Sequence, residues 1–242
     1  MPGPFEVAAG IAAAARQAGR DDPEVRRADV QSGTVTAVGV TAGTVDVGSI
    51  RARRMESYLS PTVGDQVLLI QSGTGNWWAV GRIASAAVPI GVARHVYKTS
   101  PTDRASTIVL ADDPDLTMQL PANSVNLVEF NLFVGGPANG LMVTQWTTPG
   151  DATGLKGVQG PGSAATDNAA DNISGRFGSH GFGTSITYGR RNAATNLLYA
   201  VETGVVGTVT GGTCAIAWAQ SLSNATATRM GVSSWMRVTR LS

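Results

Sequence analysis

Three aspartates, Asp112, Asp113 and Asp115, flank Pro114 and form a compact group of potential metal ligands. Carboxylate oxygens are preferred ligands of calcium, so this segment could in principle bind that ion. It lacks the remaining ligands of an EF-hand loop, however. A turn between strands, in which aspartate side chains accept hydrogen bonds from backbone amides, fits the same residues, and we favour it. We therefore predict no metal site and no cofactor.

The chain has two histidines, His95 and His180. A catalytic triad places a histidine beside a nucleophile and an acid, and no such set is recognisable. His180 lies in the run Gly178–Gly181, which has the composition of a loop and predicts a surface histidine. A zinc site would have to be completed by carboxylates, and no spacing indicates one.

An enzymatic function is less favoured by the sequence than a structural or a binding function. A wall hydrolase needs two carboxylates across a cleft, but Glu129 and Glu202 alone lie on convincing predicted strands and nothing pairs them. The Gly73-x-Gly75 pattern lacks the third glycine and the helix of a dinucleotide fingerprint, so it reads as a hairpin turn. We predict no catalytic and no cofactor-binding residues.

Charge gives little indication of nucleic-acid or membrane binding. The 242 residues carry a net charge of +1, and only 14% are charged. Arg51 and Arg53 should share one face of a strand, with Arg54 beside them. They could bind phosphate or pair with acids of a neighbouring subunit, but no aromatic residues interleave them as in a nucleic-acid groove. A subunit contact or a solvated edge is the better interpretation.

Cys214 is the single cysteine, so no disulfide can form within the chain. No apolar run reaches 18 residues, and we expect no transmembrane helix. The N-terminus has no positive segment before its apolar part, so we expect no signal peptide.

The N-terminal segment 1–22 predicts a short helix over residues 4–19. Five small or apolar residues recur near helical spacing, and alanine is the best helix former; they are Val7, Ile11, Ala14, Ala15 and Ala18. These side chains form a narrow apolar face that would bury little area, so the helix needs another surface to pack against. The helix packs either on its own domain or against copies of itself.

From about residue 29 the hydrophobic period changes to two, which is typical of strands. Short strands are predicted over 33–41, 44–47, 50–55, 67–70 and 77–80, and Gly73–Asn76 closes a hairpin between the last two. Five strands in about 55 residues suggest an OB-like barrel over residues 23–83. The adjacent Trp77 and Trp78 should face opposite ways, so one needs cover from outside the barrel.

Residues 84–92 are small, apolar and interrupted by Pro89, and we interpret them as a linker. Beyond them, clean alternation predicts an antiparallel, jelly-roll-like β-sandwich over 93–242. The clearest strands cover 116–120, 128–134, 142–146, 214–218 and 236–238. The polar, glycine-rich stretch 154–183 predicts a functional or mobile loop. Trp146, Trp218 and Trp235 should be core or interface residues, and any exposed one could stack on a sugar.

The run SYLSPTVGDQVLLIQSGTGNWWAVGRI at 57–83 resembles a segment common in minor tail and other virion proteins of actinobacterial bacteriophages. In those proteins a short N-terminal helix precedes an OB-like barrel. The second half resembles a domain recurrent in such proteins; the residues that carry this are Val96–Lys98, Asp112–Leu116 with Leu120, Cys214–Gln220 and Ser233–Arg240. The resemblance covers most of the chain except 154–183.

The resemblance implies a non-enzymatic structural protein of a tailed-phage virion, often a trimer, assembled in the bacterial host cytoplasm. The expected position is the tail tip or baseplate, and the expected partners are copies of the chain and other tail or capsid proteins. A glycan- or receptor-binding module of the virion and a capsid decoration or fibre protein are the alternatives. We expect neither nucleic-acid binding nor membrane insertion.

Overall fold

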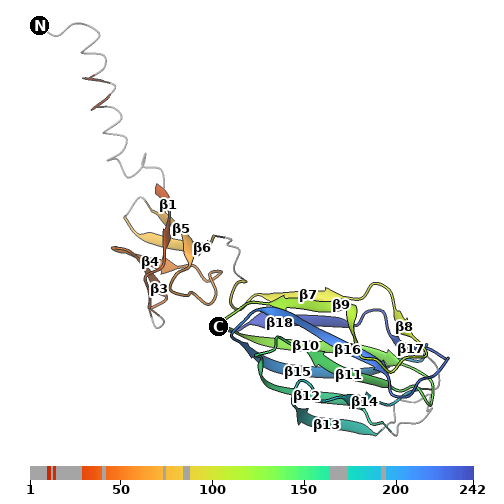
Figure 1. The fold of residues 1–242 in the computed structure, drawn as a ribbon. Helices are drawn as coiled ribbons and strands as arrows, with labels where there is room; N and C mark the ends of the chain where they lie inside the picture. Colours follow the sequence, from red (N-terminus) through yellow and green to blue (C-terminus); the bar gives the residue numbers. More distant parts are fainter. Residues whose placement is uncertain are drawn as a thin grey trace, which may run out of the picture. The chain divides into compact units, whose positions relative to one another are not determined.

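The computed structural model describes residues 10–11, 13–14, 29–39, 42–72, 75–83, 88–163, 174–191 and 195–242. The chain divides into two compact units, Met1–Ala86 and Ala87–Ser242 (Figure 1). The predicted all-β class is confirmed, because the elements of the two sheets of unit 2 and of the sheet of unit 1, β1 to β18, are all strands. Most of the predicted helix 4–19 lies outside the described residues; Gly10, Ile11, Ala13 and Ala14 have helical backbone. Within the described part, no helix has the length and apolar character needed to span a membrane.

Unit 1 contains one six-stranded sheet in the order β1-β5-β6-β4-β3-β2. Its strands are β1 (Asp29–Thr34), β2 (Ala37–Gly39), β3 (Thr44–Val47), β4 (Ile50–Arg54), β5 (Gln66–Gln71) and β6 (Trp77–Arg82). β4 and β6 are parallel, and the other pairs are antiparallel. All five predicted strands are present, although the first is divided into β1 and β2. Among the described residues, no strand pair closes this sheet into a barrel.

The core of unit 1 is built by alternating small and branched residues. Val45, Val67, Leu69 and Ala79 are fully buried, as one face of each strand turns inward. A polar cluster lies beside this core, where Asp65 accepts hydrogen bonds from the Tyr58 hydroxyl (2.6 Å) and Arg82 Nη2 (2.9 Å). Burial raises the pKa of Asp65, but these donors outweigh it and the net pKa is lowered.

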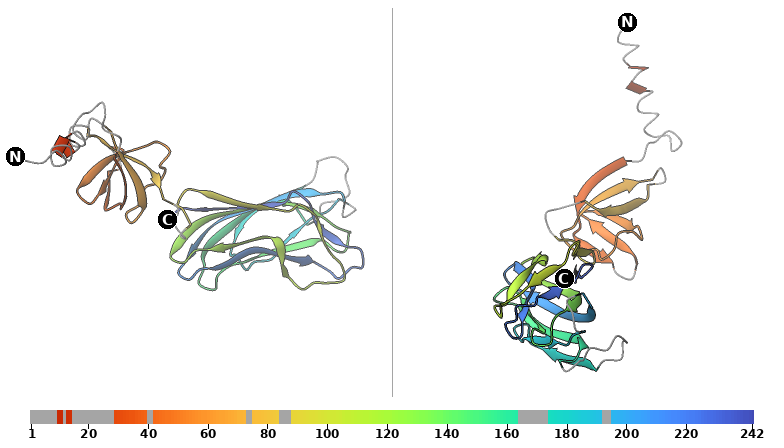
Figure 2. Two further views of the ribbon diagram at one scale, coloured as in Figure 1. Left: turned by 90° about the horizontal axis from the view of Figure 1, so that it is seen from above. Right: turned by 90° about the vertical axis from the view of Figure 1, so that its right-hand side faces the viewer.

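Unit 2 contains two sheets stacked as a sandwich (Figure 2). The larger sheet has the path β13-β12-β15-β10-β17-β8, and β18 pairs with both β10 and β7. The smaller has the order β14-β11-β16-β9. The strands are β7 (Ala93–Tyr97), β8 (Thr102–Arg104), β9 (Ala111–Leu120), β10 (Ser124–Gly135), β11 (Met142–Thr147), β12 (Thr153–Pro161), β13 (Gly175–His180), β14 (Ile186–Tyr188), β15 (Leu198–Thr208), β16 (Gly212–Gln220), β17 (Thr228–Met230) and β18 (Trp235–Arg240). Inward-facing residues of both sheets form one hydrophobic core.

The loop predicted over 154–183 is wrong for its described residues. Most of them form β12 and β13, which pair with each other and extend the larger sheet beyond β15. Gly160 allows β12 to pack closely against the core, because a Cβ at this position would lie 2.8 Å from the Tyr188 ring and 2.9 Å from Ala200 Cβ. At Gly160, therefore, the small residue is explained by close contact with the core and not by a loop.

Part of the predicted linker 84–92 belongs to unit 2. Ile90 forms a bridge with Arg240, and the Gly91 amide donates to the Arg240 carbonyl (2.8 Å). Residues 84–87 lie outside the described residues. The division between the units after Ala86 falls inside the predicted segment.

Both lysines of the chain, Lys98 and Lys156, are fully buried in unit 2. Lys156 Nζ lies 2.9 Å from Glu202 Oε2, and both side chains are inaccessible to solvent. Glu202 also accepts hydrogen bonds from three residues of the smaller sheet: Thr144 Oγ1 (2.5 Å), Trp146 Nε1 (2.8 Å) and Tyr188 OH (2.9 Å). Burial lowers the pKa of Lys156, with Glu202 opposing it. The pKa of Tyr188 is raised, mainly by burial and secondly by the negative charge of Glu202.

Replacing Lys156 with methionine should destabilise unit 2 by about 3–5 kcal/mol, because Glu202 would keep a buried charge without its cation. The double substitution Lys156→Met/Glu202→Gln should cost less, since it removes both charges. Urea unfolding followed by circular dichroism measures the difference. Arg53→Met, at an exposed position, is the control and should change the free energy of unfolding by no more than about 0.5 kcal/mol. A double variant less stable than Lys156→Met would contradict this account.

Candidate binding surface

One row of residues crosses the outer face of the larger sheet, from β13 to β7. Directly opposed residues of neighbouring strands share a face, and the pairing gives the row Phe177, Gln159, Val201, Asn131, Trp235 and Tyr97. The residues on either side of the row along the strands, such as Val158, Glu202 and Met236, are buried in the core. We call these six residues, with the adjoining Tyr199 and Phe133, the aromatic row.

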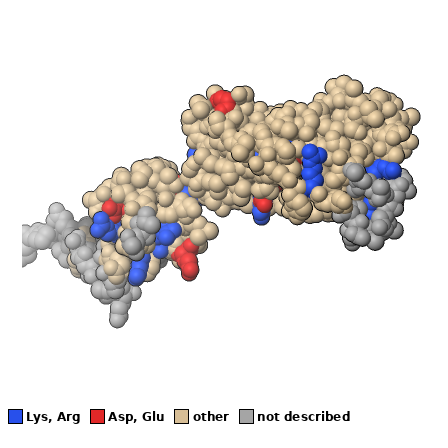
Figure 3. Space-filling view, turned by 90° about the horizontal axis from the view of Figure 1, so that it is seen from below, with Lys and Arg blue, Asp and Glu red and all other residues tan. Residues whose placement is uncertain are grey.

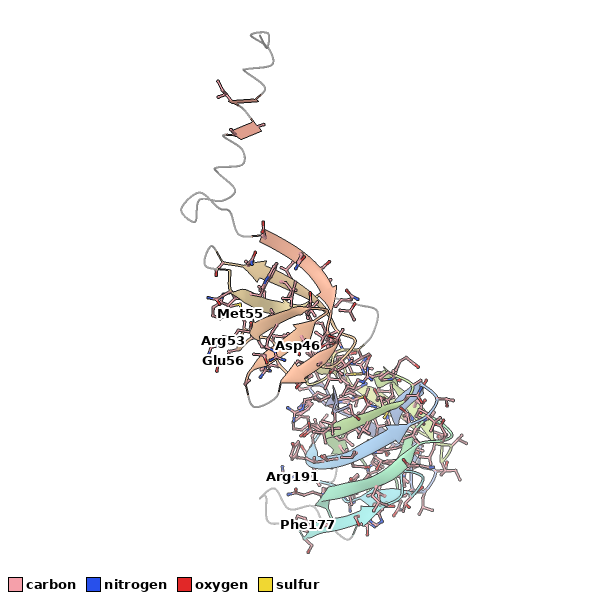
Figure 4. All side chains as sticks on the ribbon, turned by 90° about the vertical axis from the view of Figure 1, so that its left-hand side faces the viewer. Asp46, Arg53, Met55, Glu56, Phe177 and Arg191 are labelled. Atoms are coloured by element: carbon pink, nitrogen blue, oxygen red, sulfur yellow. The ribbon has the colours of Figure 1, made fainter. Side chains whose placement is uncertain are left out.

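The aromatic row exposes large rings to solvent. Phe177, Tyr97 and Tyr199 are 74%, 65% and 52% exposed, and Phe177 lies at the β13 edge of the sandwich (Figure 4). The Tyr199 and Phe133 rings lie 5.5 Å apart, and the Tyr199 hydroxyl donates to Asn131 Oδ1. Partial burial and the nearby charge of Glu129 raise the pKa of Tyr199, which keeps its hydroxyl protonated. Exposed large apolar side chains are found at both ends of the row, and exposed apolar patches mark interaction sites.

A shallow pocket lies at the β13 end of the aromatic row. Its volume is about 390 Å³, and its lining is Gln159, Gly160, Pro161, Gly175, Phe177, Tyr199 and Val201. A second hollow of about 260 Å³ shares Gln159, Phe177 and Val201 with it. No Lys, Arg, His, Asp or Glu is among these lining residues. Two rings around an amide side chain suit a neutral ligand with both apolar and hydroxyl groups.

An ion pair lies next to the aromatic row on the same outer face. Arg237 Nε donates to Glu129, and this hydrogen bond raises the pKa of Arg237. The Arg237 guanidinium lies 5.8 Å from the centre of the Trp235 ring, and the His95 ring is 6.4 Å from the same tryptophan. Glu129 is thus paired with a cation on the outer face, while Glu202 faces the core; the two carboxylates do not meet across a cleft.

The three aspartates lie within strand β9, so the predicted turn between strands is wrong in location. Four residues of β9, from Asp113 to Leu116, stand opposite Ile216 alone, so the strand bulges outward from the regular pairing here. The expected hydrogen bonds are present, because Asp113 Oδ1 accepts from the amides of Asp115 (3.1 Å) and Leu116 (3.3 Å). Asp113 also pairs with Lys98 (2.9 Å). Among the described residues, no group of three or more His, Cys, Asp or Glu side chains could hold a metal ion.

The remaining candidates have mixed outcomes. His180 ends strand β13 and does not lie in a loop, and His95 lies on β7. Cys214 is buried, and this burial raises the pKa of its thiol to about 12. Trp146 and Trp218 are core residues, as predicted.

In unit 1, Arg51 and Arg53 share the exposed face of β4, as expected, and Arg51 pairs with Asp46 of its own chain (2.8 Å). Arg54 donates to the Tyr58 carbonyl. Trp77 packs against the core of unit 1 while Trp78 is 38% exposed, so the two do face opposite ways.

Sequence reasoning missed most of the aromatic row. Phe177 lies in the segment predicted as a loop, and the strands that carry Tyr97 and Tyr199 were not predicted with their bounds. A signal was present, because Tyr199, Val201, Thr203 and Val205 occupy every second position of β15, the spacing of one strand face.

Comparisons with known proteins do not identify this chain. No protein-family model and no curated protein matches it. Matches to solved structures include infectious bursal disease virus of the Gx strain, with 11% identity, a TM-score of 0.17 and coverage of 87% of this chain and 56% of that one. The VP2 subviral particle of infectious bursal disease virus matches with 9% identity, a TM-score of 0.15 and coverage of 87% and 59%. This chain therefore spans less than two thirds of either, and likenesses this weak support no conclusion.

Substituting alanine for Phe177 should leave stability almost unchanged, within about 0.5 kcal/mol, because the ring buries little area. Phe130→Ala, at a fully buried position of the same sheet, is the matched control and should cost about 3–5 kcal/mol. Urea unfolding of both variants gives the comparison. A large loss of stability for Phe177→Ala would mean that the ring is a structural element rather than part of a binding surface.

Proposed function

We propose that the chain is a non-enzymatic structural protein of a tailed-phage virion, at the tail tip or baseplate, that assembles as a homo-oligomer. The resemblance of residues 57–83 and of the second half to actinobacteriophage virion proteins supports this role and favours a trimer. A capsid decoration or fibre protein is the alternative position within the same class.

We further propose that unit 2 is a jelly roll. With β7, β9, β10, β11, β14, β15, β16 and β18 numbered one to eight, the larger sheet reads 1-8-3-6 and the smaller reads 2-7-4-5. This interleaving of two sheets supports the jelly-roll assignment, with β12 and β13 as an added hairpin. Jelly rolls are frequent in viral capsid and lectin domains, although the fold alone does not define function.

We also propose that unit 1 is a small barrel of the OB type. The two strands at opposite edges of its sheet are β1 and β2, and only Val35 and Thr36 separate them in the chain. The Val35 amide donates to the Asp65 carbonyl (2.8 Å), and the Thr36 amide donates to the Asp46 carbonyl (2.7 Å). One bent strand would then join both edges of the sheet, with a parallel β4–β6 pair as in OB folds.

The exposed aromatic row carries the proposal of a binding and assembly role. It places Tyr97, Trp235 and Phe177 on one sheet face, and aromatic side chains are the commonest anchors of protein interfaces. The surface otherwise bears few charges, as the view in Figure 3 illustrates. We assign the β7 end of the row, around Tyr97, to the contact between subunits.

The full-length chain should therefore have a mass in solution of three times 24.9 kDa. Size-exclusion chromatography with light scattering measures this. Tyr97→Asp should weaken association at least about tenfold, because it buries a charge at the contact. Val209→Asp, at a similarly exposed position (65%), is the control and should not. A monomer at high concentration that is absent from the virion would contradict the proposed function.

The pocket at the β13 end specifically favours a second function, the binding of a neutral glycan on the host surface. The pocket combines the rings of Phe177 and Tyr199 with the amide of Gln159. An aromatic ring offers an apolar surface to the C–H groups of a sugar, while the amide can hydrogen-bond its hydroxyls.

The full-length chain should bind host cell-wall polysaccharide, and Tyr199→Ala or Phe177→Ala should weaken this binding at least about tenfold, equivalent to about 1.4 kcal/mol. An immobilised-polysaccharide assay measures the affinity. Leu222→Ala, at an exposed position (63%) that is not among the pocket's lining residues, should bind as the wild type does. Equal binding by all four proteins, or no binding by any, would count against the glycan function and leave the virion role unaffected.

A further inference from the structure

A buried lysine in unit 2 contacts two carboxylates at once. Lys98 Nζ lies 2.9 Å from Asp113 Oδ1 and 2.6 Å from Asp115 Oδ2, and it donates its third hydrogen bond to Thr102 Oγ1 (2.8 Å). The Lys98 and Asp113 side chains are inaccessible to solvent, whereas that of Asp115 is 43% exposed. The backbone of Lys98 is fixed by hydrogen bonds to Ser233 and Ser234.

This arrangement brings together a nucleophile, an electrophile and a group that can carry protons. We infer that Lys98 and Asp113 can form an intramolecular amide, or isopeptide, bond, with Asp115 as the catalytic proton carrier. The reaction is a self-modification, and it is independent of the proposed virion and glycan functions.

The step balances without any co-reactant. Lys98 Nζ attacks Asp113 Cγ, the N–C bond forms, and the bond from Cγ to Oδ1 breaks. Two of the three ammonium protons pass to the departing oxygen, which leaves as water, and the third stays on the amide nitrogen. Asp115 accepts protons from Nζ and delivers them to that oxygen, so its carboxylate is regenerated. No net charge changes, and nothing is oxidised or reduced.

The surroundings favour this reaction. Asp113 Oδ2 accepts a hydrogen bond from Trp218 Nε1 (3.0 Å), a donor positioned to stabilise negative charge on that oxygen during attack. The Arg104 guanidinium lies 4.1 Å from the centre of the Trp218 ring, which adds positive charge nearby. Fixed reactants at contact distance avoid the entropic cost of an encounter. The product also removes two buried charges, whose desolvation is costly.

The second buried ion pair of the chain provides an internal comparison. Lys156 contacts Glu202 at the same distance, 2.9 Å, in an equally buried site. Among the described residues, no second carboxylate pairs with Lys156 Nζ, so this site has no group to carry protons. We therefore expect Lys98, and not Lys156, to react.

The bond would tie β7, at one edge of the larger sheet, to β9, at one edge of the smaller sheet. The ring closed by this bond spans residues 98–113, which include β8 of the larger sheet and the first residues of β9 of the smaller sheet. Such a link would resist separation of the layers from their edge.

Mass spectrometry of the purified full-length chain tests the inference. The denatured protein should be lighter than its sequence by one water. After trypsin digestion, peptide 95–104 should remain uncleaved after Lys98 and be joined through that lysine to Asp113 in peptide 105–156. Cleavage after Lys156 should be normal. In Asp115→Asn, which preserves the side-chain volume, the joined peptides should disappear and Lys98 should become cleavable.

A wild-type mass equal to that of the sequence, with normal cleavage after Lys98, would overturn the inference. So would a bond to Asp115, or a bond that persists in Asp115→Asn. The wild-type peptide map decides the question even if the variant does not fold.

Discussion

Two fully buried carboxylates, Asp113 and Glu202, impose the strongest constraint on unit 2. A buried charge is tolerated only when a counter-charge and hydrogen bonds replace the lost water. Each carboxylate therefore has one buried lysine and one tryptophan indole, Lys98 with Trp218 and Lys156 with Trp146. Everything that packs around these groups must keep those contacts.

The Glu202 site sets how the two sheets meet. Glu202 and Lys156 come from the larger sheet, while Thr144, Trp146 and Tyr188 come from the smaller one. Hydrogen bonds need closer alignment than apolar contacts do. A slip of one residue in β15 would turn Glu202 to the outer face and leave Lys156 without its partner. The contacts of Glu202 therefore specify the register of β15, whereas a buried ion pair adds little net free energy.

Because the inner faces satisfy the core, the outer face of the larger sheet is free to carry a binding surface. The added hairpin of β12 and β13 widens this face and brings Phe177 beside Tyr199 and Gln159. Its glycines allow the close approach to the core at Gly160 that a larger residue would block. The polar, glycine-rich composition of the hairpin thus reflects its role as a thin sheet edge.

Local sequence patterns are sufficient to predict the all-β class and most strand positions. Alternation along 116–120 and 128–134 is a local property, and it predicts the buried residues of these strands except Asn131, which was expected on the exposed face and is buried. Adjacent Trp77 and Trp78 likewise had to face opposite sides. Strand pairing depends on contacts between distant segments, and it is this pairing that places Phe177, Trp235 and Tyr97 in one row. The same holds for the lysines: Lys156 and Glu202 are 46 residues apart, and no local pattern encodes that contact. In this protein the Lys156–Glu202 ion pair and the aromatic row both arise from pairing between distant strands, and the local hydrophobic period contains no information about that pairing.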